Sequence, residues 1–213
     1  MTEISIISHA CFKIKSEDGT IIYTDPYEIP DDEEKADIII PSHSHYDHFD
    51  GNAVKKVKKE DTKVIGPKSI AKKLEQFKGE GLEIGDSKEI GNIKITLVPA
   101  YTIKKSTHPK SNNWAGSIIE VDGKKIYHAG DTERIPEMKK LKDKDITVAL
   151  LPCGGTYTMD MEEASKAALD ISPKILIPMH NWDKDMTEIK QILAEKNSDI
   201  QVEILDKENP LII

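Results

Sequence analysis

Three short apolar segments of this sequence end in the same way, and this repeated pattern constrains the fold more than any other feature. Each segment runs into a proline and then into a residue that offers a polar side chain or a tight turn. The segments are Ile38-Ile39-Ile40-Pro41-Ser42-His43, Ala149-Leu150-Leu151-Pro152-Cys153-Gly154 and Ile175-Leu176-Ile177-Pro178-Met179-His180. Such short, wholly apolar runs are typical of strands that are buried on both faces. Since α/β proteins build sites where strands end, the pattern predicts an α/β fold with a site at one sheet edge.

Strand-like and helix-like patterns continue through the rest of the chain. Other strands are predicted over residues 4–7, 11–14, 20–24, 90–99, 117–121 and 125–128, and the apolar segments give strands over 38–40, 146–151 and 174–178. Helices are predicted over residues 53–59, 69–77 and 136–141, from a cap at Asp160, and from a cap at Thr187 through Glu195. No linker rich in Pro, Gly or Ser separates the two halves, so we expect a single domain over residues 1–213.

Charge and hydropathy exclude several classes of protein. Thirty Lys and Arg against 38 Asp and Glu give a net charge of −8, which argues against a nucleic-acid-binding surface. No apolar run approaches the ~18–20 residues that span a bilayer, and the N-terminus lacks the pattern of a signal peptide. The two cysteines, Cys11 and Cys153, lack metal-type spacing. We therefore expect a cytoplasmic protein without a membrane partner.

The strongest chemical signal is the segment His43-Ser44-His45-Tyr46-Asp47-His48, directly after a predicted strand. In an extended segment, residues two apart point the same way, so His43 and His45 can bind one cation together. The turn that follows can present Asp47 and His48 to another cation. Nitrogen and oxygen ligands of this kind suit Zn²⁺, Mn²⁺ or Fe²⁺. The segment predicts a metal site.

This segment resembles the His-x-His-x-Asp-His signature of the metallo-β-lactamase superfamily. Other segments agree with that family in the same order along the chain, and the later ones resemble its compact branch of ascorbate-6-phosphate lactonase-like and related hydrolases. They are Ser8-His9-Ala10-Cys11-Phe12, Thr24-Asp25-Pro26, Tyr127-His128-Ala129-Gly130-Asp131-Thr132, 151–159 and Ile177-Pro178-Met179-His180-Asn181. The resemblance implies an αββα four-layer sandwich with a two-metal cleft along one edge of the sheets.

The resemblance also implies a role for individual residues. His43 and His45 would bind a first metal ion, and Asp47, His48 and His180 a second. Asp131 would bridge both ions, because one carboxylate can hold two dications ~3.5–4 Å apart. We expect two divalent ions, zinc in the first place and manganese or iron(II) as alternatives.

The sequence departs from the family at the third ligand of the first metal. Many relatives have a histidine where this chain has Tyr101, and the next histidine is His108. A tyrosine is a poor substitute, since its phenol must lose a proton near pKa 10 to bind well. We therefore assign His108 as the ligand, with His9 and His128 as alternatives.

Several other residues are expected to lie near the cleft. Asp25 is expected to accept a hydrogen bond from a ligand imidazole and to fix its tautomer. Cys153 is expected to pack rather than to bind metal, and Tyr157 and Trp182 to form a wall of the cleft or part of the core. Arg134, the only arginine, could clamp a phosphate or carboxylate, but a place on a helix surface is the preferred interpretation.

These assignments predict a metal-dependent hydrolase. Metal-activated water would attack an ester, lactone or phosphoester of a small molecule, and Asp47 would orient that water or accept its proton. A homo-oligomer is compatible with this function. The alternatives are a non-catalytic metal-binding protein and a nuclease or di-iron oxidoreductase of the same superfamily. The nuclease would be expected to carry an added domain, and the oxidoreductase a Glu at position 45 and a flavin domain.

Overall fold

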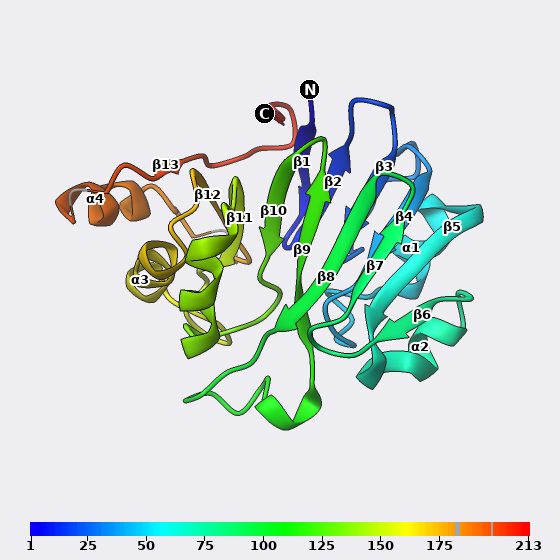
Figure 1. The fold of residues 1–213 in the computed structure, drawn as a ribbon, viewed down its shortest axis with the longest axis horizontal. Helices are drawn as coiled ribbons and strands as arrows, with labels where there is room; N and C mark the ends of the chain where they lie inside the picture. The colour runs from blue at the N-terminus through cyan, green and yellow to red at the C-terminus, as the bar shows by residue number, and fades with distance from the viewer. Residues whose placement is uncertain (182–183, 197) are drawn as a thin grey trace.

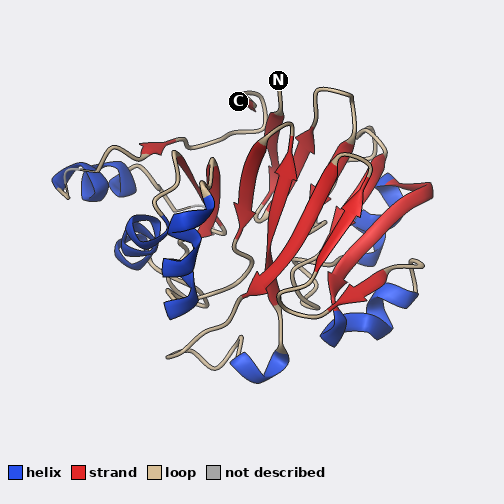
Figure 2. Cartoon of the chain, in the orientation of Figure 1, coloured by secondary structure: helices blue, strands red, loops and turns tan. Residues whose placement is uncertain are grey.

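The fold consists of two seven-stranded sheets that lie face to face, with helices on both outer sides (Figure 1, Figure 2). The structure is a computed structural model, and it describes residues 1–181, 184–196 and 198–213. One apolar core lies between the sheets, and each helical layer covers a further core on the outer face of its sheet. The predicted αββα four-layer sandwich is therefore confirmed.

The first sheet contains the first strands of the chain and its last one. Its order is β14-β1-β2-β3-β4-β5-β6, antiparallel from β14 to β3 and parallel from β3 to β6. The strands are β1 (Glu3–Ser8), β2 (Cys11–Lys15), β3 (Ile21–Thr24), β4 (Ala36–Ile40), β5 (Lys58–Pro67), β6 (Glu80–Leu82) and β14 (Leu211–Ile212). Because β14 pairs with β1, the two chain ends lie side by side (Figure 1).

The second sheet has the order β13-β12-β11-β10-β9-β8-β7, antiparallel from β7 to β10 and parallel from β10 to β13. Its strands are β7 (Ser87–Ile90), β8 (Ile93–Pro99), β9 (Ala115–Val121), β10 (Lys124–His128), β11 (Val148–Pro152), β12 (Ile175–Met179) and β13 (Gln201–Val202). The three apolar segments of the sequence thus become β4, β11 and β12, which are parallel strands inside the two sheets.

The apolar character of these strands follows from their position between two cores. In β4, Ile38 and Ile40 belong to the core between the sheets, while Ile39 belongs to the core under the helices. Strand β11 alternates in the same way, with Leu150 facing the other sheet and Leu151 facing the helices. Successive side chains of a strand point to opposite faces, so a strand that is covered on both faces needs apolar residues throughout.

The helices form the two outer layers. α1 (Gly51–Val57), η1 (Lys68–Ile70) and α2 (Ala71–Glu75) cover the first sheet, and η3 (Pro136–Lys144), α3 (Met161–Ile171) and α4 (Glu188–Glu195) cover the second. The predicted cap is confirmed at Asp160, whose carboxylate accepts a 2.8 Å hydrogen bond from the Glu163 N–H. A further short helix, η2 (Lys110–Asn112), lies in the loop between β8 and β9.

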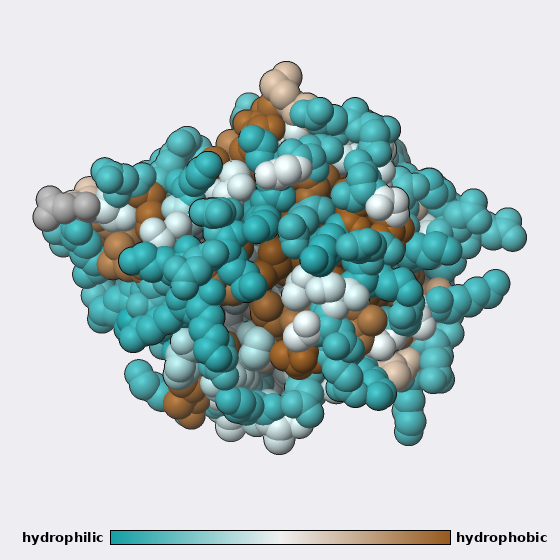
Figure 3. Space-filling model, in the orientation of Figure 1, coloured by the Kyte–Doolittle hydropathy of each residue, from teal (hydrophilic) through white to brown (hydrophobic). Residues whose placement is uncertain are grey.

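The face shown in Figure 3 is mainly hydrophilic. Among the described residues, no helix has both the length and the apolar composition needed to cross a membrane.

Two predicted boundaries in the first half are wrong. The helix predicted over 53–59 ends at Val57, because Lys58 begins β5 and pairs with Ala36 of β4. The helix predicted over 69–77 is a 3₁₀ turn followed by the short α2. Strands β5 and β6 were not predicted, since the charged start of β5 has no alternating pattern.

Three predictions in the second half also need correction. The strand predicted over 90–99 begins only at Ile93, as β8, because Gly91 adopts φ +60° in the turn of the hairpin that joins β7 to β8. The helix predicted over 136–141 is the 3₁₀ helix η3, which extends to Lys144. Thr187 does precede α4, but its backbone is helical, and its side chain makes no capping hydrogen bond within the described part of the chain.

Candidate metal centre

The predicted site residues converge where strands from both sheets end. His43, His45, Asp47 and His48 follow β4 of the first sheet. The second sheet supplies three more: Asp131 from just beyond β10, His180 from directly after β12, and His108 from the loop between β8 and β9. All seven residues that the sequence singled out as ligands are thus brought together.

Asp131 lies at the middle of the cluster. Its Oδ2 atom is 3.1 Å from His108 Nε2 and 3.2 Å from His180 Nε2, while its Oδ1 atom is 3.4 Å from His48 Nε2. All four side chains are buried. One carboxylate therefore faces imidazoles from three different segments of the chain.

The candidate ligand atoms form three overlapping groups, one of which includes the carboxylate of Asp131. Within each group, the candidate ligand atoms all lie within 4.8 Å of one another. The groups are His43, His45 and His108; His43, His48 and Asp131; and His9, Asp47, His48 and His180. In the first group His45 Nδ1 is 3.0 Å from His43 Nε2 and 3.3 Å from His108 Nε2. Such clusters are of the size at which one cation can touch several side chains.

Asp25, as predicted, fixes the imidazoles from behind. Its carboxylate accepts hydrogen bonds from the backbone N–H and the hydroxyl of Ser42, at 2.6 and 2.8 Å, and from His48 Nδ1 at 2.6 Å. Because the Ser42 hydroxyl gives its only proton to Asp25, it must accept the 2.9 Å hydrogen bond from His43 Nδ1. Both imidazoles are thereby oriented with Nε2 toward the cluster.

Three residues at the site have a left-handed backbone. The φ angles are +49° at His9, +39° at Asp25 and +54° at His180. This conformation is uncommon for residues other than glycine, and it concentrates at functional sites where the surrounding structure maintains it. The strain lies in the turns that deliver these three side chains to the cluster.

Burial and mutual charge shift the pKa values of the cluster in opposite directions. Burial lowers the pKa of His43 well below its usual range, and the neighbouring His48 lowers it further. Burial also opposes charge on His48, but the carboxylates of Asp131 and Asp25 outweigh it and raise the His48 pKa well above its usual range. Burial likewise would raise the pKa of Asp131, yet the imidazoles of His48 and His180 hold it well below. The imidazole of His48, which lies between the carboxylates of Asp131 and Asp25, thus favours its positively charged form.

The sequence from residue 3 to 180 matches the Beta-lactamase superfamily domain. The chain belongs to the metallo-β-lactamase superfamily. It is 36% identical to the UPF0173 metal-dependent hydrolase of Nanoarchaeum equitans, over 98% of this chain and 99% of that one. It is 33% identical to the UPF0173 metal-dependent hydrolase of Pyrococcus abyssi, over 92% of this chain and 94% of that one. It is therefore a member of the UPF0173 family of metal-dependent hydrolases.

A solved structure agrees with this assignment. The crystal structure of a putative metal-dependent hydrolase from Parabacteroides distasonis superposes with a TM-score of 0.86 at 38% identity, and covers 95% of this chain and 93% of its own. A match over nearly the full length of both chains supports the two sheets and the four layers together.

The cluster of candidate ligands opens into a cavity of about 260 Å³. It is lined by His45, Tyr46, Asp47, Thr107, His108, Asp131, Tyr157 and His180. The predicted wall residue Tyr157 is among them, whereas Trp182 lies outside the described residues. Cys153 does pack as predicted: it is buried beside Met186, and burial raises the pKa of its thiol to about 12.

The two alternative histidines have different environments. His128 is buried, and its Nε2 donates a 2.9 Å hydrogen bond to the Ala10 carbonyl while its Nδ1 accepts one from the Gly130 N–H. Both ring nitrogens are therefore used away from the cluster. His9 belongs to the cluster, but beside Asp47, with Nε2 3.6 Å from the Asp47 carboxylate. Neither lies where the third ligand of the first metal was expected.

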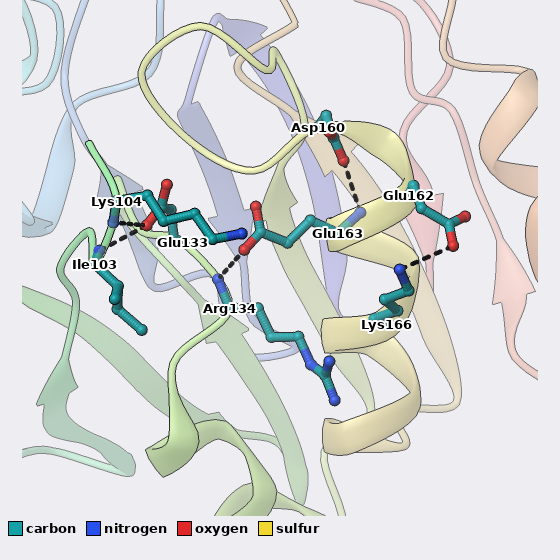
Figure 4. Close-up of a pocket in the computed structure, with 8 residues that line it drawn as sticks. All are labelled: Ile103, Lys104, Glu133, Arg134, Asp160, Glu162, Glu163 and Lys166. Carbon is teal, nitrogen blue, oxygen red and sulfur yellow. Dashed lines mark hydrogen bonds and ion pairs between the residues drawn. The ribbon is translucent and has the colours of Figure 1, made fainter.

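His108 is held by a clamp that the sequence did not reveal. Thr102 and His108 are joined across the loop by a 2.7 Å backbone hydrogen bond. The buried Glu133 carboxylate accepts hydrogen bonds from the N–H groups of Ile103 and Lys104, at 2.6 and 2.7 Å (Figure 4). Since Glu133 lies two residues after Asp131, it ties the loop of His108 to the segment of Asp131.

Two further residues complete this picture. The Trp114 ring lies against the imidazoles of His43 and His45, with centroids 4.7 and 4.8 Å away, and forms one side of the cluster. Only its position just before β9 could have suggested this role. Arg134 lies outside the cluster, in the neighbouring cavity of Figure 4, and binds both carboxylate oxygens of Asp170.

Proposed function

We propose that this protein is a dinuclear hydrolase in which His43, His45 and His108 hold one metal ion and Asp47, His48 and His180 a second. Asp131 would bridge the two. The observation that carries this proposal is the convergence of three imidazoles on one buried carboxylate. His48 Nε2 and Asp131 Oδ1 are buried and face each other at 3.4 Å, longer than a good hydrogen bond, and neither atom has another hydrogen-bond partner among the described residues. Burying polar atoms lowers the stability of the folded protein unless a hydrogen bond or a bound cation compensates them.

The chemistry of the donors fits a divalent transition metal. Imidazole nitrogens with a minority of carboxylates suit zinc, and also manganese or iron(II). The Nδ1 atoms of His48 and His43 are fixed by Asp25 and Ser42, the arrangement that raises the affinity of histidine ligands. We propose zinc in the first place.

Different residues of the chain have different roles in the proposed hydrolysis. Bound dications would supply Lewis-acid polarisation of the substrate and activation of water. Asp47 reaches the cavity, and the hydrogen bond from His9 and the charge of His48 outweigh its burial and lower its pKa. It therefore stays ionised at neutral pH and can orient a water molecule or accept its proton. The buried Asp131 and Asp25 hold the imidazoles in place.

The substrate we propose is a small ester, lactone or phosphoester. A cavity of about 260 Å³ is slightly smaller than the ~300–1,000 Å³ typical of ligand pockets, which favours a small molecule over a polymer. We also propose a single domain over residues 1–213, because the core between the sheets contains residues from both halves. The two unpaired, buried cysteines are consistent with the reducing cytoplasm.

The test is to remove and restore the metal. We expect close to two ions per chain by elemental analysis, and metal-dependent hydrolysis of at least one ester, lactone or phosphodiester. His45→Ala should lower that rate by several decades, because it removes one of three imidazoles of the first site. The matched control is His128→Gln, since His128 is a buried histidine outside the cluster. Full metal content without any turnover would favour the non-catalytic alternative.

A further inference from the structure

We infer that this site selects uncharged substrates that carry a flat aromatic ring beside the ester or lactone group, with Tyr46 and Tyr157 holding the ring. The inference rests on the proposed hydrolase function and narrows its substrate class. In the reaction, the oxygen of water bonds to the carbonyl carbon, the bond from that carbon to the leaving oxygen breaks, and a proton passes to the leaving oxygen. The products are a carboxylic acid and an alcohol or phenol.

The first observation is where the exposed aromatic side chains lie. Tyr46 is 68% exposed and Tyr157 is 46% exposed, and both line the cavity that contains His45, Asp47 and Asp131. Large hydrophobic side chains are otherwise rarely exposed in the described part of the chain. Aromatic rings at the mouth of a site offer a large apolar area, and the tyrosine hydroxyl can stay in water.

Neighbouring residues hold the Tyr46 ring and the loop that carries Tyr157. The Tyr46 ring meets the Tyr27 ring edge to face, at 5.9 Å and 78°. Tyr157 lies in a loop whose carbonyl groups at Gly154 and Thr158 accept hydrogen bonds from lysines. A braced ring loses less entropy when a ligand packs against it. The two rings are therefore suited to contact a planar group of a substrate.

The second observation concerns positive charge. None of the described residues that line the cavity is a lysine or an arginine. Three cations of the surrounding loops bind acceptors of the protein itself: Lys105 the Thr158 carbonyl, Lys184 the Gly154 carbonyl, and Arg134 the Asp170 carboxylate. A phosphate or carboxylate remote from the reacting group would thus lose its hydration without gaining a partner, which is costly. The net charge of −8 also disfavours the approach of anions.

The experiment compares three acetate esters on the metal-loaded protein. Phenyl acetate carries an uncharged ring, 4-acetoxybenzenesulfonate carries the same ring with a remote negative charge, and ethyl acetate carries no ring. Each kcat/KM is divided by the rate of that ester with hydroxide, which corrects for leaving-group reactivity. We expect the corrected kcat/KM to be highest for phenyl acetate, by about tenfold over either of the others.

Variants then identify the residues responsible. Tyr46→Ala and Tyr157→Ala should each lower kcat/KM for phenyl acetate by about 3- to 10-fold, the range measured for one aromatic contact, and leave ethyl acetate nearly unchanged. Tyr46→Phe and Tyr157→Phe should retain the preference. Ile103→Ala is the control, because Ile103 is 60% exposed but lines the neighbouring cavity. Metal content and thermal midpoints show that each variant is folded and loaded.

The outcomes separate this inference from the proposed function. Equal corrected rates for the charged and uncharged phenyl esters, or equal losses on phenyl and ethyl acetate in the alanine variants, would overturn the inference and leave the hydrolase intact. No metal-dependent hydrolysis of any of the three esters, in protein that holds two ions, would refute ester hydrolysis and the inference with it.

Discussion

The Nδ1 atom of His48 donates a 2.6 Å hydrogen bond to Asp25, and both side chains are completely buried. The same carboxylate binds the hydroxyl and the backbone N–H of Ser42, which in turn fixes His43. One aspartate behind the cluster therefore orients an imidazole of each proposed metal site, and it does so from the end of β3 in the first sheet.

The first prediction concerns this contact. In Asp25→Asn, the amide group would face His48 Nδ1 as a donor, so His48 would shift its proton to Nε2 and lose the lone pair that binds metal. We expect metal affinity at the second site to fall by about 10–100-fold. Titration calorimetry with zinc measures this, and Asp50→Asn, which keeps a helix cap, is the control. Unchanged affinity would mean that Asp25 serves only to stabilise the fold.

The second prediction tests the bridge. Asp131→Ala should weaken both sites at once, because its two oxygens lie 3.1–3.4 Å from imidazoles of both proposed sites. His180→Ala, by comparison, should empty mainly the second site. Elemental analysis after dialysis against a weak chelator distinguishes the two results. One site that stays fully occupied in Asp131→Ala would show that the carboxylate does not bridge.

The third prediction concerns the departure from the family at position 101. His108→Ala should lower first-site affinity by about 10–100-fold or more and leave the second site largely filled. Tyr101→Phe should change metal content little, since the Tyr101 hydroxyl points to Glu137, at 2.9 Å, rather than into the cluster. A cobalt-substituted protein reports the loss through its absorption spectrum. If both variants lost metal equally, the assignment of His108 would be wrong.

The fourth prediction concerns the clamp on the His108 loop. Glu133→Ala leaves the N–H groups of Ile103 and Lys104 without their acceptor, so we expect a loss of about 1–3 kcal/mol in the free energy of unfolding. First-site metal affinity should fall as well, by about tenfold, because the loop that carries His108 loosens. Glu133→Gln keeps an acceptor oxygen and should restore most of both. Loss of stability with unchanged metal affinity would limit Glu133 to a structural role.

The fifth prediction concerns pH and the buried His128. Burial lowers its pKa in the folded protein, whereas an unfolded histidine titrates near ~6.5. Below about pH 6.5, His128 therefore binds a proton in the unfolded chain but not in the folded one. The stability contributed by neutral His128 is lost as the pH falls toward its folded pKa.

We expect His128→Gln to flatten this loss, because a glutamine amide can donate to the Ala10 carbonyl without titrating. Urea unfolding of the metal-free protein at several values between about pH 7 and pH 5 gives the two curves. Parallel curves for the wild type and the variant would contradict the assignment.

Much of this protein follows from its sequence alone. The runs at 38–40, 149–151 and 175–177 predicted strands buried on both faces, because a side chain that alternates between two apolar cores must be apolar at every position. The spacing of His43, His45, Asp47 and His48 predicted that their side chains gather as candidate metal ligands, since these residues are neighbours in the chain. The start of α3 was also predictable, because the Asp160 cap is a local hydrogen bond.

Only the tertiary structure decided what depends on contacts between distant segments. It placed His9 beside Asp47, directed both nitrogens of His128 away from the cluster, and set Trp114 against the imidazoles. Strand β5 formed despite its charged start, because pairing with β4 outweighs local propensity. The clamp from Glu133 to the His108 loop spans about 30 residues of sequence, and no local pattern marks such a pair. Local hydrogen bonds and alternation are encoded residue by residue, whereas the orientation of a buried side chain is settled only when the sheets and loops around it have packed.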